Sequence, residues 1–377
     1  MNSESTILLI GVGGAGSAMA RGVRRAFGEG LRYLLVDTDA STGREGEPFV
    51  LLGGGRLAGH GAGGDTVAAS LSAEESASSL DQHIEGVRLA VVVTALGGGT
   101  GGGATSDIVK HLDSLGIPVV VFATTPFTFE GEDRLRNARG VMSQVSEFAA
   151  STFFMPLNDL VAGEDNMAEA LKRAVDTLAS AVTLFWRLVG KPGYIRLDVE
   201  RLRKLVKGAG RGRFAVATAN GEHRADKIVV SLTQSPFLAF GSSPVRSILC
   251  GILAGDDLRL SEVGKIAGGL QTAFGEKSVF ELATVNDEAT FSGRISVVAM
   301  LFEADFAPRP EADASPFALS AEDRKPQPSR PSRRAAKNPL SQGPQGRGRF
   351  NNVAPTIWHG MDLDTPTYLR QGITLEF

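Results

Sequence analysis

The sequence has very little cysteine and few of the larger aromatic residues: one cysteine, two tryptophans and three tyrosines occur among 377 residues. The single thiol, Cys250, cannot form an internal disulfide, and in its apolar segment it is typical of a small buried hydrophobic side chain. A fold without disulfides suits a reducing compartment, so we expect a cytoplasmic location.

Long apolar runs are also missing. The two longest, around 89–96 and 117–123, are much shorter than a membrane-spanning helix requires. The apolar stretch 6–11 is too short for the core of a signal peptide, and no basic segment precedes it. The formal net charge of −3 provides no overall attraction to nucleic acid or to a membrane surface. We therefore expect no direct membrane span and no specific nucleic-acid partner.

The first half of the chain alternates short apolar runs with amphipathic stretches. Four runs are almost continuous in valine, leucine and isoleucine, which is typical of strands buried on both faces of a parallel sheet: 7–10, 31–36, 89–95 and 119–124. Helices are expected to begin after the turns at Gly16, Gly103 and Gly131. The fold class is therefore predicted to be α/β, with an N-terminal domain built on a parallel sheet.

Apolar residues at helical spacing predict one long helix from about Asn166 to Val189, which should end at the glycines and proline of 190–193. A second, smaller α/β unit should follow, with strands near 214–218, 247–253, 278–283 and 294–302. After Phe306 the composition changes to proline, serine, glutamine, glycine and arginine, which favours a disordered linker. The predicted parts are 1–165, a nucleotide-binding domain; 166–192, the central helix; 193–306, the C-terminal α/β domain; 307–360, the linker; and 361–377, a docking peptide.

Two glycine-rich turns each follow a predicted strand and precede a helix, at 11–16 and 97–103. Glycine allows the backbone to approach a ligand closely, and a helix N-terminus offers free N–H groups and a positive dipole end to an anion. Because the lysine of a P-loop is absent, phosphates are expected to bind mainly to backbone amides, with Thr100 adding a hydroxyl.

The first turn alone has a second interpretation. Its Gly-x-Gly-x-x-Gly pattern, with Asp37 at the end of the next strand, is the dinucleotide-binding pattern in which the acid binds a ribose hydroxyl. An NAD-binding oxidoreductase is thus the main alternative, although that pattern does not require the second glycine run. The simplest alternative is that both runs are only tight turns, but so many glycines are costly in chain entropy.

Six motifs in the same order resemble those of the tubulin/FtsZ family of bacterial cell-division proteins. The run 97–103 is similar to the tubulin signature Gly-Gly-Gly-Thr-Gly-Thr-Gly, with Gly102 in place of the second threonine. The other segments are similar to the family's first phosphate loop, Asn-Thr-Asp-Ala segment, γ-phosphate-sensing loop, ribose-contacting segment and C-terminal-domain marker: 11–16, 36–40, 59–64, 126–134 and 253–260. The resemblance covers roughly residues 5–305.

The resemblance implies a GTP/GDP site, with Mg²⁺ carried on the nucleotide and no metal ligand from the protein. Glu130 would hold the ribose, Arg134 would lie beside ribose and phosphate, and Asn158 would reach the base, although this chain has one extra residue there. Asp176 would read guanine, because a carboxylate offers two acceptors to the paired N–H donors of that base; an ordinary exposed helical acid is the alternative. Leu171 replaces the family's usual phenylalanine. The implied nucleotide-binding residues are Gly13, Gly14, Ala15, Gly16, Ser17, Ala18, Asp39, Gly98, Gly99, Thr100, Gly101, Glu130, Arg134, Asn158 and Asp176.

In the family a loop of one subunit completes the nucleotide pocket of the next, and its acids polarise the attacking water. The matching loop here is 193–203, where Asp198 keeps the first acid as the implied catalytic residue, but Arg196 replaces an asparagine and Arg201 the second acid. A guanidinium cannot accept a proton from water at neutral pH. Arg201 pairing with phosphate, as an arginine finger does, is the alternative. We expect slow GTP hydrolysis with assembly retained.

The tail segment 364–370 resembles the family's C-terminal motif, which docks onto membrane-tethering division proteins, with Pro366, Tyr368 and Leu369 as its anchors. The sequence is thus predicted to encode a GTP-binding, GTP-hydrolysing protein that polymerises head to tail at the division site. Such a heterologous contact does not close on itself, so filaments follow. A non-hydrolysing, tubulin-like structural filament protein is the second alternative.

Overall fold

The computed structural model describes residues 6–28, 30–160, 166–191, 193–206, 210–239, 244–275 and 277–303, and two short strands at 357–358 and 361–362. The chain divides into two units, Met1–Ala314 and Ser315–Phe377. In the second unit, β11 (Ile357–Trp358) pairs antiparallel with β12 (Met361–Asp362). The remainder of the predicted linker and docking peptide, with Pro366, Tyr368 and Leu369, lies outside the described residues.

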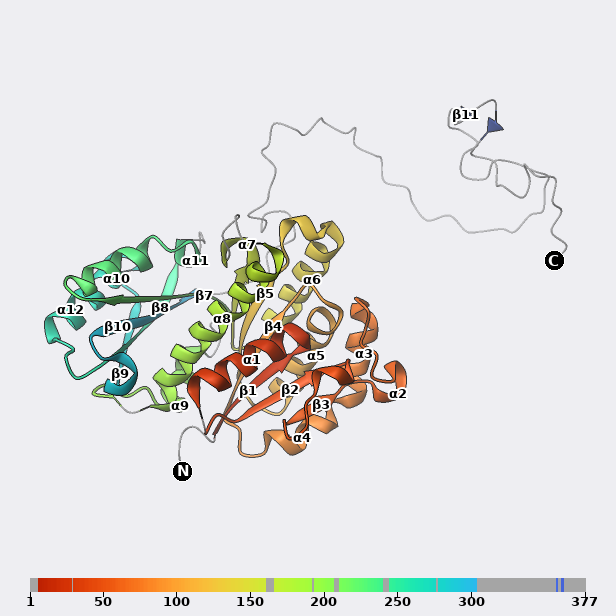
Figure 1. Ribbon diagram of the computed structural model, residues 1–377, viewed down its shortest axis with the longest axis horizontal. Helices are drawn as coiled ribbons and strands as arrows, with labels where there is room; N and C mark the ends of the chain where they lie inside the picture. The colour runs from red at the N-terminus through yellow and green to blue at the C-terminus, as the bar shows by residue number, and fades with distance from the viewer. Residues whose placement is uncertain are drawn as a thin grey trace, which may run out of the picture. The chain divides into compact units, whose positions relative to one another are not determined.

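One ten-stranded sheet runs through the first unit in the order β3-β2-β1-β4-β5-β6-β7-β10-β8-β9 (Figure 1). The pairings from β3 to β7 are parallel, whereas β10 is antiparallel to both β7 and β8. The strands are β1 (Ile7–Val12), β2 (Tyr33–Asp37), β3 (Phe49–Leu51), β4 (Leu89–Ala95), β5 (Val119–Thr125), β6 (Ser151–Pro156), β7 (Gly210–Asn220), β8 (Val245–Ala254), β9 (Val279–Asn286) and β10 (Arg294–Glu303). The predicted α/β class with a parallel N-terminal sheet is confirmed.

Helices cover the sheet (Figure 1). In the first half they are α1 (Gly13–Phe27), α2 (Gly54–Leu57), α3 (Thr66–Ser76), α4 (Ser78–Ile84), α5 (Gly99–Ser114), α6 (Glu132–Phe148) and α7 (Leu157–Leu160), with 3-10 turns η2 (Ala40–Thr42) and η3 (Thr128–Glu130). The second half has α8 (Met167–Gly190), α9 (Val199–Val206), α10 (Arg224–Thr233), α11 (Pro236–Ala239), α12 (Leu260–Phe274) and α13 (Glu288–Phe291). Strands β3 and β6 were not predicted from the sequence.

The glycine runs form the first turns of helices rather than loops before them. Helix α1 begins at Gly13 and α5 at Gly99, earlier than the expected starts after Gly16 and Gly103. The reason is steric: a Cβ at Gly16 would collide with the Val93 carbonyl oxygen of β4, and one at Gly101 with that of Ala95. Glycine therefore lets the first turn of each helix lie directly against the strands.

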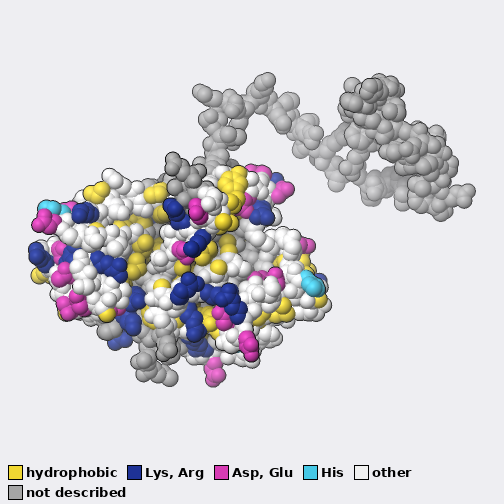
Figure 2. Space-filling model, viewed as in Figure 1, with side chains coloured by type: hydrophobic (Ala, Val, Ile, Leu, Met, Phe, Trp, Pro, Cys, Tyr) yellow, Lys and Arg dark blue, Asp and Glu magenta, His cyan; other side chains and the backbone are white. Residues whose placement is uncertain are grey.

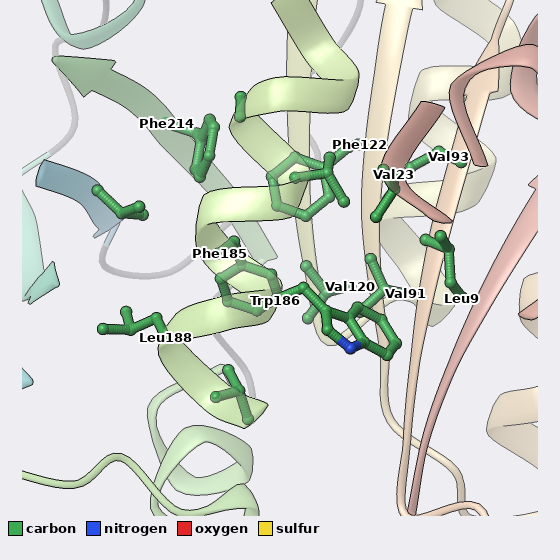
Figure 3. Packing of buried hydrophobic residues seen from close by; sticks show 14 of the residues in the cluster. Leu9, Val23, Val91, Val93, Val120, Phe122, Phe185, Trp186, Leu188 and Phe214 are labelled. Carbon is green, nitrogen blue, oxygen red and sulfur yellow. The ribbon is translucent and has the colours of Figure 1, made fainter. Parts of the chain in front are cut away.

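The long helix α8 follows its prediction within one residue at each end. Its N-cap is Asn166, whose side chain accepts a hydrogen bond from the Glu169 N–H at 3.0 Å. Its apolar face carries Phe185 and Trp186 into the core between the helix and the sheet, where Trp186 lies among side chains of β1, β4 and β5 (Figure 3). Leu188 points to the other side, against Gly251 of β8. This helix thus connects the two halves of the first unit through one continuous core.

Lys and Arg side chains gather near the middle of the face shown in Figure 2. Among the cations of this unit, Arg24 and Arg25 lie in the last turn of α1, and Arg187 lies in the last turn of α8 with Lys191 after it. Several of these cations have partners within the protein: Arg24 lies over the Tyr33 ring and Lys191 over the Phe27 ring. These two cations therefore pack against aromatic rings of the fold itself.

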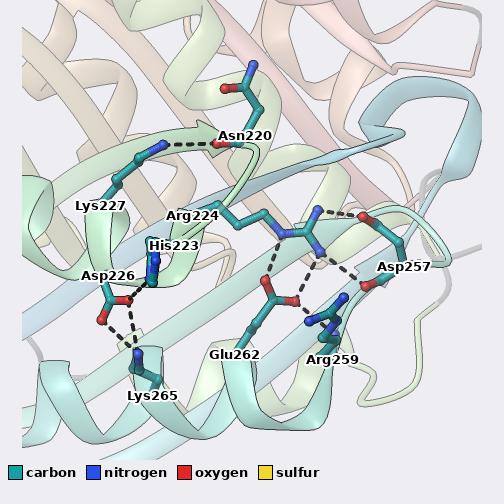
Figure 4. Close-up of polar contacts among 9 residues, drawn as sticks. All are labelled: Asn220, His223, Arg224, Asp226, Lys227, Asp257, Arg259, Glu262 and Lys265. Carbon is teal, nitrogen blue, oxygen red and sulfur yellow. Dashed lines mark hydrogen bonds and ion pairs between the residues drawn. The ribbon is translucent and has the colours of Figure 1, made fainter.

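In the second half, α10 and α12 pack on the sheet around a buried arginine (Figure 4). Arg224 of α10 donates to Glu262 of α12 at 2.8 and 3.0 Å, and to Asp257 before that helix at 2.6 Å. Beyond this network the Lys265–Asp226 ion pair at 2.8 Å is exposed.

Because β7 of this half pairs with β6 of the first, Met1–Ala314 is one compact unit, and the domain boundaries inside it stay a prediction. Within the described residues, no helix is both long and apolar enough to cross a membrane.

Candidate functional site

The strand order predicts a ligand-binding crevice at the carboxyl ends of β1 and β4. Strand β2 follows β1 on one side, whereas β4, β5 and β6 follow one another on the other, so the strand order reverses between β1 and β4. Ligands of open α/β sheets bind outside the carboxyl ends of the strands at such a switch point. Both glycine runs lie there, because α1 leaves β1 and α5 follows β4.

Helices α1 and α5 present uncapped N-termini to this crevice. Their N-cap residues, Val12 and Gly98, make no side-chain cap hydrogen bond, and neither first turn contains an acid. By contrast, Asp65 caps α3 by accepting from the N–H groups of Val67 and Ala68. The first N–H groups of α1 and α5 therefore suit an external acceptor such as phosphate.

The two helix starts touch each other and a third loop. Gly13 has φ +74°, which favours glycine, and a Cβ there would lie 3.2 Å from the Gly101 nitrogen. A Cβ on Gly99 would lie 2.9 Å from the nitrogen of Gly64, in the loop 59–64. The three glycine-rich segments that the sequence singled out are thus brought together, with almost no side chain between them.

A chain of hydrogen bonds beneath these segments ends on a buried acid. The Ala62 N–H donates to the Thr38 hydroxyl at 3.0 Å, and that hydroxyl lies 2.7 Å from the Thr100 hydroxyl. Thr100 in turn donates to Asp37 Oδ1 at 2.8 Å, and Thr42 donates to Oδ2 at 2.7 Å. Since its hydroxyl is engaged in this way, Thr100 would meet a phosphate through its backbone N–H.

This arrangement argues against the dinucleotide interpretation. Asp37 is 3% exposed and both of its carboxylate oxygens accept hydrogen bonds from the protein, so it is not available to a ribose. Its neighbour Asp39 is more exposed and accepts from the Ser41 N–H at 2.8 Å. The Ser41 hydrogen bonds lower the pKa of the Asp39 carboxyl.

The segment after β5 holds an oriented carboxylate. Glu130 Oε1 accepts from the Phe127 N–H at 2.8 Å, and Oε2 accepts from Arg134 at 2.6 Å. A Cβ built on Gly97 would lie 3.8 Å from Glu130 Oε2, so this carboxylate reaches the start of the second glycine run. Glu130 and Arg134 therefore lie beside the phosphate-binding segment, as the resemblance implies.

The base-reading candidates come from α7 and α8. Asn158 is exposed on α7, which follows β6, and Asp176 is exposed on α8. Helices α1 and α8 run side by side in the same direction, since Gly22 faces Ala179 and, further along, the Ala26 carbonyl accepts from Arg187. One turn before Gly22 on α1 is Ala18, and one turn before Ala179 on α8 is Asp176. Because the helices run in the same direction, Asp176 lies near the start of α1.

The predicted nucleotide-binding residues divide into a buried and an accessible set. The buried set shapes the backbone: Gly13, Gly16, Ser17, Gly99, Thr100 and Gly101. The Ser17 hydroxyl is buried and has no hydrogen-bond partner among the described residues. The accessible set comprises the half-buried Asp39 and Glu130 and seven exposed residues: Gly14, Ala15, Ala18, Gly98, Arg134, Asn158 and Asp176. A nucleotide phosphate fits these donors, and the residue assignments stay predictions.

Comparison with known proteins places this arrangement in a family. The tubulin/FtsZ family GTPase domain matches residues 6–162. The cell division protein FtsZ of Rickettsia conorii is 30% identical over 313 residues, covering 81% of this chain and 69% of that protein. That of Wigglesworthia glossinidia brevipalpis is 29% identical over 310 residues, covering 79% and 80%. The chain belongs to the tubulin/FtsZ family.

Solved structures show the same fold. An empty FtsZ dimer from M. jannaschii superposes with a TM-score of 0.74 at 21% identity, covering 81% of this chain and 95% of that chain. CetZ2 from Haloferax volcanii, in a GTPγS-bound protofilament, gives 0.67 at 22% identity, with coverage of 81% and 95%. The sequence resemblance to the tubulin/FtsZ family is therefore confirmed, including its GTPase-domain class.

The segment similar to the FtsZ catalytic loop lies beyond the other end of α8. Between Asp176 and its last residue, Gly190, the helix rises about 21 Å, so this loop does not reach the nucleotide site of its own subunit. Asp198 caps α9, accepting from the Arg201 N–H at 2.8 Å, and its side chain is exposed. Arg201 forms an ion pair with Glu281 of β9 at 2.5 Å.

Two residues with structural roles were not identified from the sequence: Thr38 at the candidate site and Glu281 beside the FtsZ-like loop. Thr38 links the loop 59–64 to α5, and no motif indicated that role. Glu281 could have been noticed, because a carboxylate inside the apolar strand segment 278–283 needs a partner. It is 8% exposed, and its partner is the arginine that replaces the family's second acid.

Proposed function

We propose that this protein binds GTP at the crevice between the starts of α1 and α5 and assembles head to tail through the bound nucleotide. The uncapped N-termini of α1 and α5 would hold the phosphates, Glu130 and Arg134 the ribose, and Asn158 and Asp176 the base. Mg²⁺ would travel with the phosphates. The chemistry of the donor set supports this: neutral N–H groups for phosphate and a carboxylate for guanine.

The observation that carries the proposal is the placement of the two predicted halves of the active site at opposite ends of α8. A nucleotide at the start of α1 and Asp198 beyond Gly190 are separated by most of that helix. They can act together only when the Asp198 end of one subunit meets the nucleotide of another. The same contact repeated in one direction builds a filament. The similar solved structures include an empty FtsZ dimer and a GTPγS-bound CetZ2 protofilament, which supports this arrangement.

Hydrolysis in such a filament is expected to be slow. Asp198 has one carboxylate oxygen engaged in capping α9, and Arg201 supplies no second acid to polarise water. The Glu281 ion pair also occupies Arg201, which disfavours an arginine finger. The cell-division proteins among the relatives support a role in forming a septal ring. The proposal includes a cytoplasmic location at the division site and docking of Pro366, Tyr368 and Leu369 onto membrane-tethering division proteins.

Nucleotide identity tests the binding half of the proposal. Nucleotide released from the purified protein by denaturation should be GDP or GTP, and competition titrations should rank GTP far above ATP and NAD. Asp176→Asn should weaken GTP binding by about tenfold or more, because one oxygen that accepts from guanine becomes a donor. The exposed Asp113→Asn, at the far end of α5, is the matched control and should bind as wild type does. Retained NAD, or equal affinity for ATP and GTP, would refute the assignment.

A further inference from the structure

Helix α9 is held by two ion pairs of opposite polarity on adjacent residues. Glu200 accepts from Arg88 at 2.6 Å, and Arg88 directly precedes β4 of the first half. Arg201 pairs with Glu281 at 2.5 Å, and Glu281 lies on β9 in the second half. The helix that Asp198 caps is therefore tied to both halves of the unit.

The two pairs differ in burial. In the Arg88–Glu200 pair, both side chains are about half exposed, at 51% and 47%. In the other pair, Arg201 is 58% exposed but Glu281 only 10%. Exposed ion pairs contribute little to stability, whereas a largely buried carboxylate without a partner is costly. Of the two pairs, Arg201–Glu281 is therefore the one whose loss should destabilise the fold more.

The local electrostatics of α9 also indicate that Arg201 depends on Glu281. Arg201 lies in the first turn, where the positive end of the helix dipole disfavours a cation. Asp198 and Glu200 at that end are favourable for the helix. The presence of an arginine there is accounted for by Glu281, which faces it from β9. The charge at position 201 is thus set by a buried partner and not by the helix itself.

We propose that Glu281 is a positioning residue for Asp198: through Arg201 it fixes the first turn of α9 and hence the direction of the carboxylate that caps it. The proposal rests on the proposed function, in which Asp198 faces the nucleotide of the next subunit. It also predicts that a single change will not restore the function of the family's second acid. Arg201→Asp places a carboxylate beside Glu281, and repulsion between the two disturbs the turn that Asp198 caps.

The test uses the full-length chain as Glu281→Gln, Glu281→Arg, Arg201→Glu and the charge-swapped Arg201→Glu/Glu281→Arg. Lys265 and Asp226 form an exposed ion pair between α12 and α10, so Asp226→Lys/Lys265→Asp is the matched control swap. Three readouts are taken: amide hydrogen exchange over 199–206, affinity for a fluorescent GTP analogue, and phosphate release per assembled subunit at saturating GTP.

Exchange in the first turn of α9 should rise by about tenfold in the single variants, and the swap should return it to within about threefold of wild type. Phosphate release should fall as exchange rises in Glu281→Gln and Glu281→Arg, which keep Arg201. In the swap, which restores the pair and also places an acid at position 201, it should return to the wild-type rate or exceed it. GTP affinity should stay constant in all variants because the nucleotide site is at the other end of α8. Unchanged exchange in Glu281→Gln, or no recovery in the swap, overturns the proposal. Altered exchange with unchanged phosphate release reduces the pair to a structural contact and also overturns it. Failure of the wild type to bind GTP defeats the proposed function, while the exchange data still decide whether Glu281 holds α9.

Discussion

At the scale of single residues, the glycines at the start of α5 serve two separable purposes. Gly103 is a packing glycine, because a Cβ there would collide with the Thr66 carbonyl oxygen of α3. Gly98 has open space where its Cβ would stand, and its φ of −95° is accessible to any residue. Glycine at 103 is thus required by the fold, whereas the reason for glycine at 98 lies outside the free subunit.

This difference gives a paired prediction. Gly103→Ala should lower the free energy of unfolding by about 2 kcal/mol, since overpacking forces α3 and α5 apart. Gly98→Ala should cost under about 1 kcal/mol, yet weaken GTP binding because its methyl group occupies the space proposed for phosphate. Chemical denaturation without nucleotide and GTP titration measure the two effects. If the Gly98→Ala protein binds GTP as tightly as wild type does, phosphate does not occupy that space.

Several residue roles were accessible from the sequence and others were not. The glycine runs were accessible because their spacing is local, whereas Glu130 and Asp176 were assigned through the family resemblance and their roles stay predictions. Asp37 was given a ribose-binding role as one alternative because the pattern shows its position after a strand but not its partners. Its hydrogen bonds come from Thr42 and Thr100, and the second of these lies far away in sequence, so only the fold reveals it.

At the scale of elements, most strands and the long helix could be predicted because hydrophobic periodicity marks them directly. The helix starts were misplaced, since glycine was interpreted as a loop former while packing against β4 makes it the first turn of a helix. The short edge strand β3 has only three residues, too few to show a period. The sequence therefore indicated the segments that meet at the candidate site but described them with the wrong local structure.

The Arg224 network should make the C-terminal half sensitive to acid (Figure 4). Glu262 accepts hydrogen bonds from the Arg224 side chain and from the Arg259 N–H, and these lower the pKa of its carboxyl below the ordinary value of 4.5. A carboxyl whose folded pKa is depressed binds fewer protons in the folded state, so its contribution to stability is present above pH 4.5 and lost as the pH falls through the folded pKa.

The corresponding variant is Glu262→Gln. It should reduce the free energy of unfolding at pH 7 by about 1–3 kcal/mol, because charge-assisted hydrogen bonds to a buried guanidinium are lost, and it should flatten the fall in stability below pH 4.5. Urea denaturation between pH 3 and pH 7 measures both. The exposed acid of the neighbouring pair serves as the control, and Asp226→Asn should have the smaller effect at pH 7. Equal losses in the two variants would show that burial of the Arg224 network adds nothing.

At the scale of the whole molecule, the central claim is that one subunit contains both parts of an active site but cannot bring them together. Helix α8 separates the proposed nucleotide site from Asp198, so the proposed function links hydrolysis to assembly. The arginine at position 201, which supplies no second acid, then makes hydrolysis, rather than assembly, the expected weak step. A filament that persists after GTP addition follows from this combination.

Light scattering recorded together with phosphate release in the same sample tests this claim most directly. Addition of GTP, but not GDP, should raise scattering above a threshold protein concentration. Phosphate should appear only above that threshold, at a rate at least about tenfold below that of a family member with an acid at the position of Arg201. Phosphate release below the threshold would show that a single subunit is sufficient, and the absence of GTP-dependent scattering at any concentration would contradict the account.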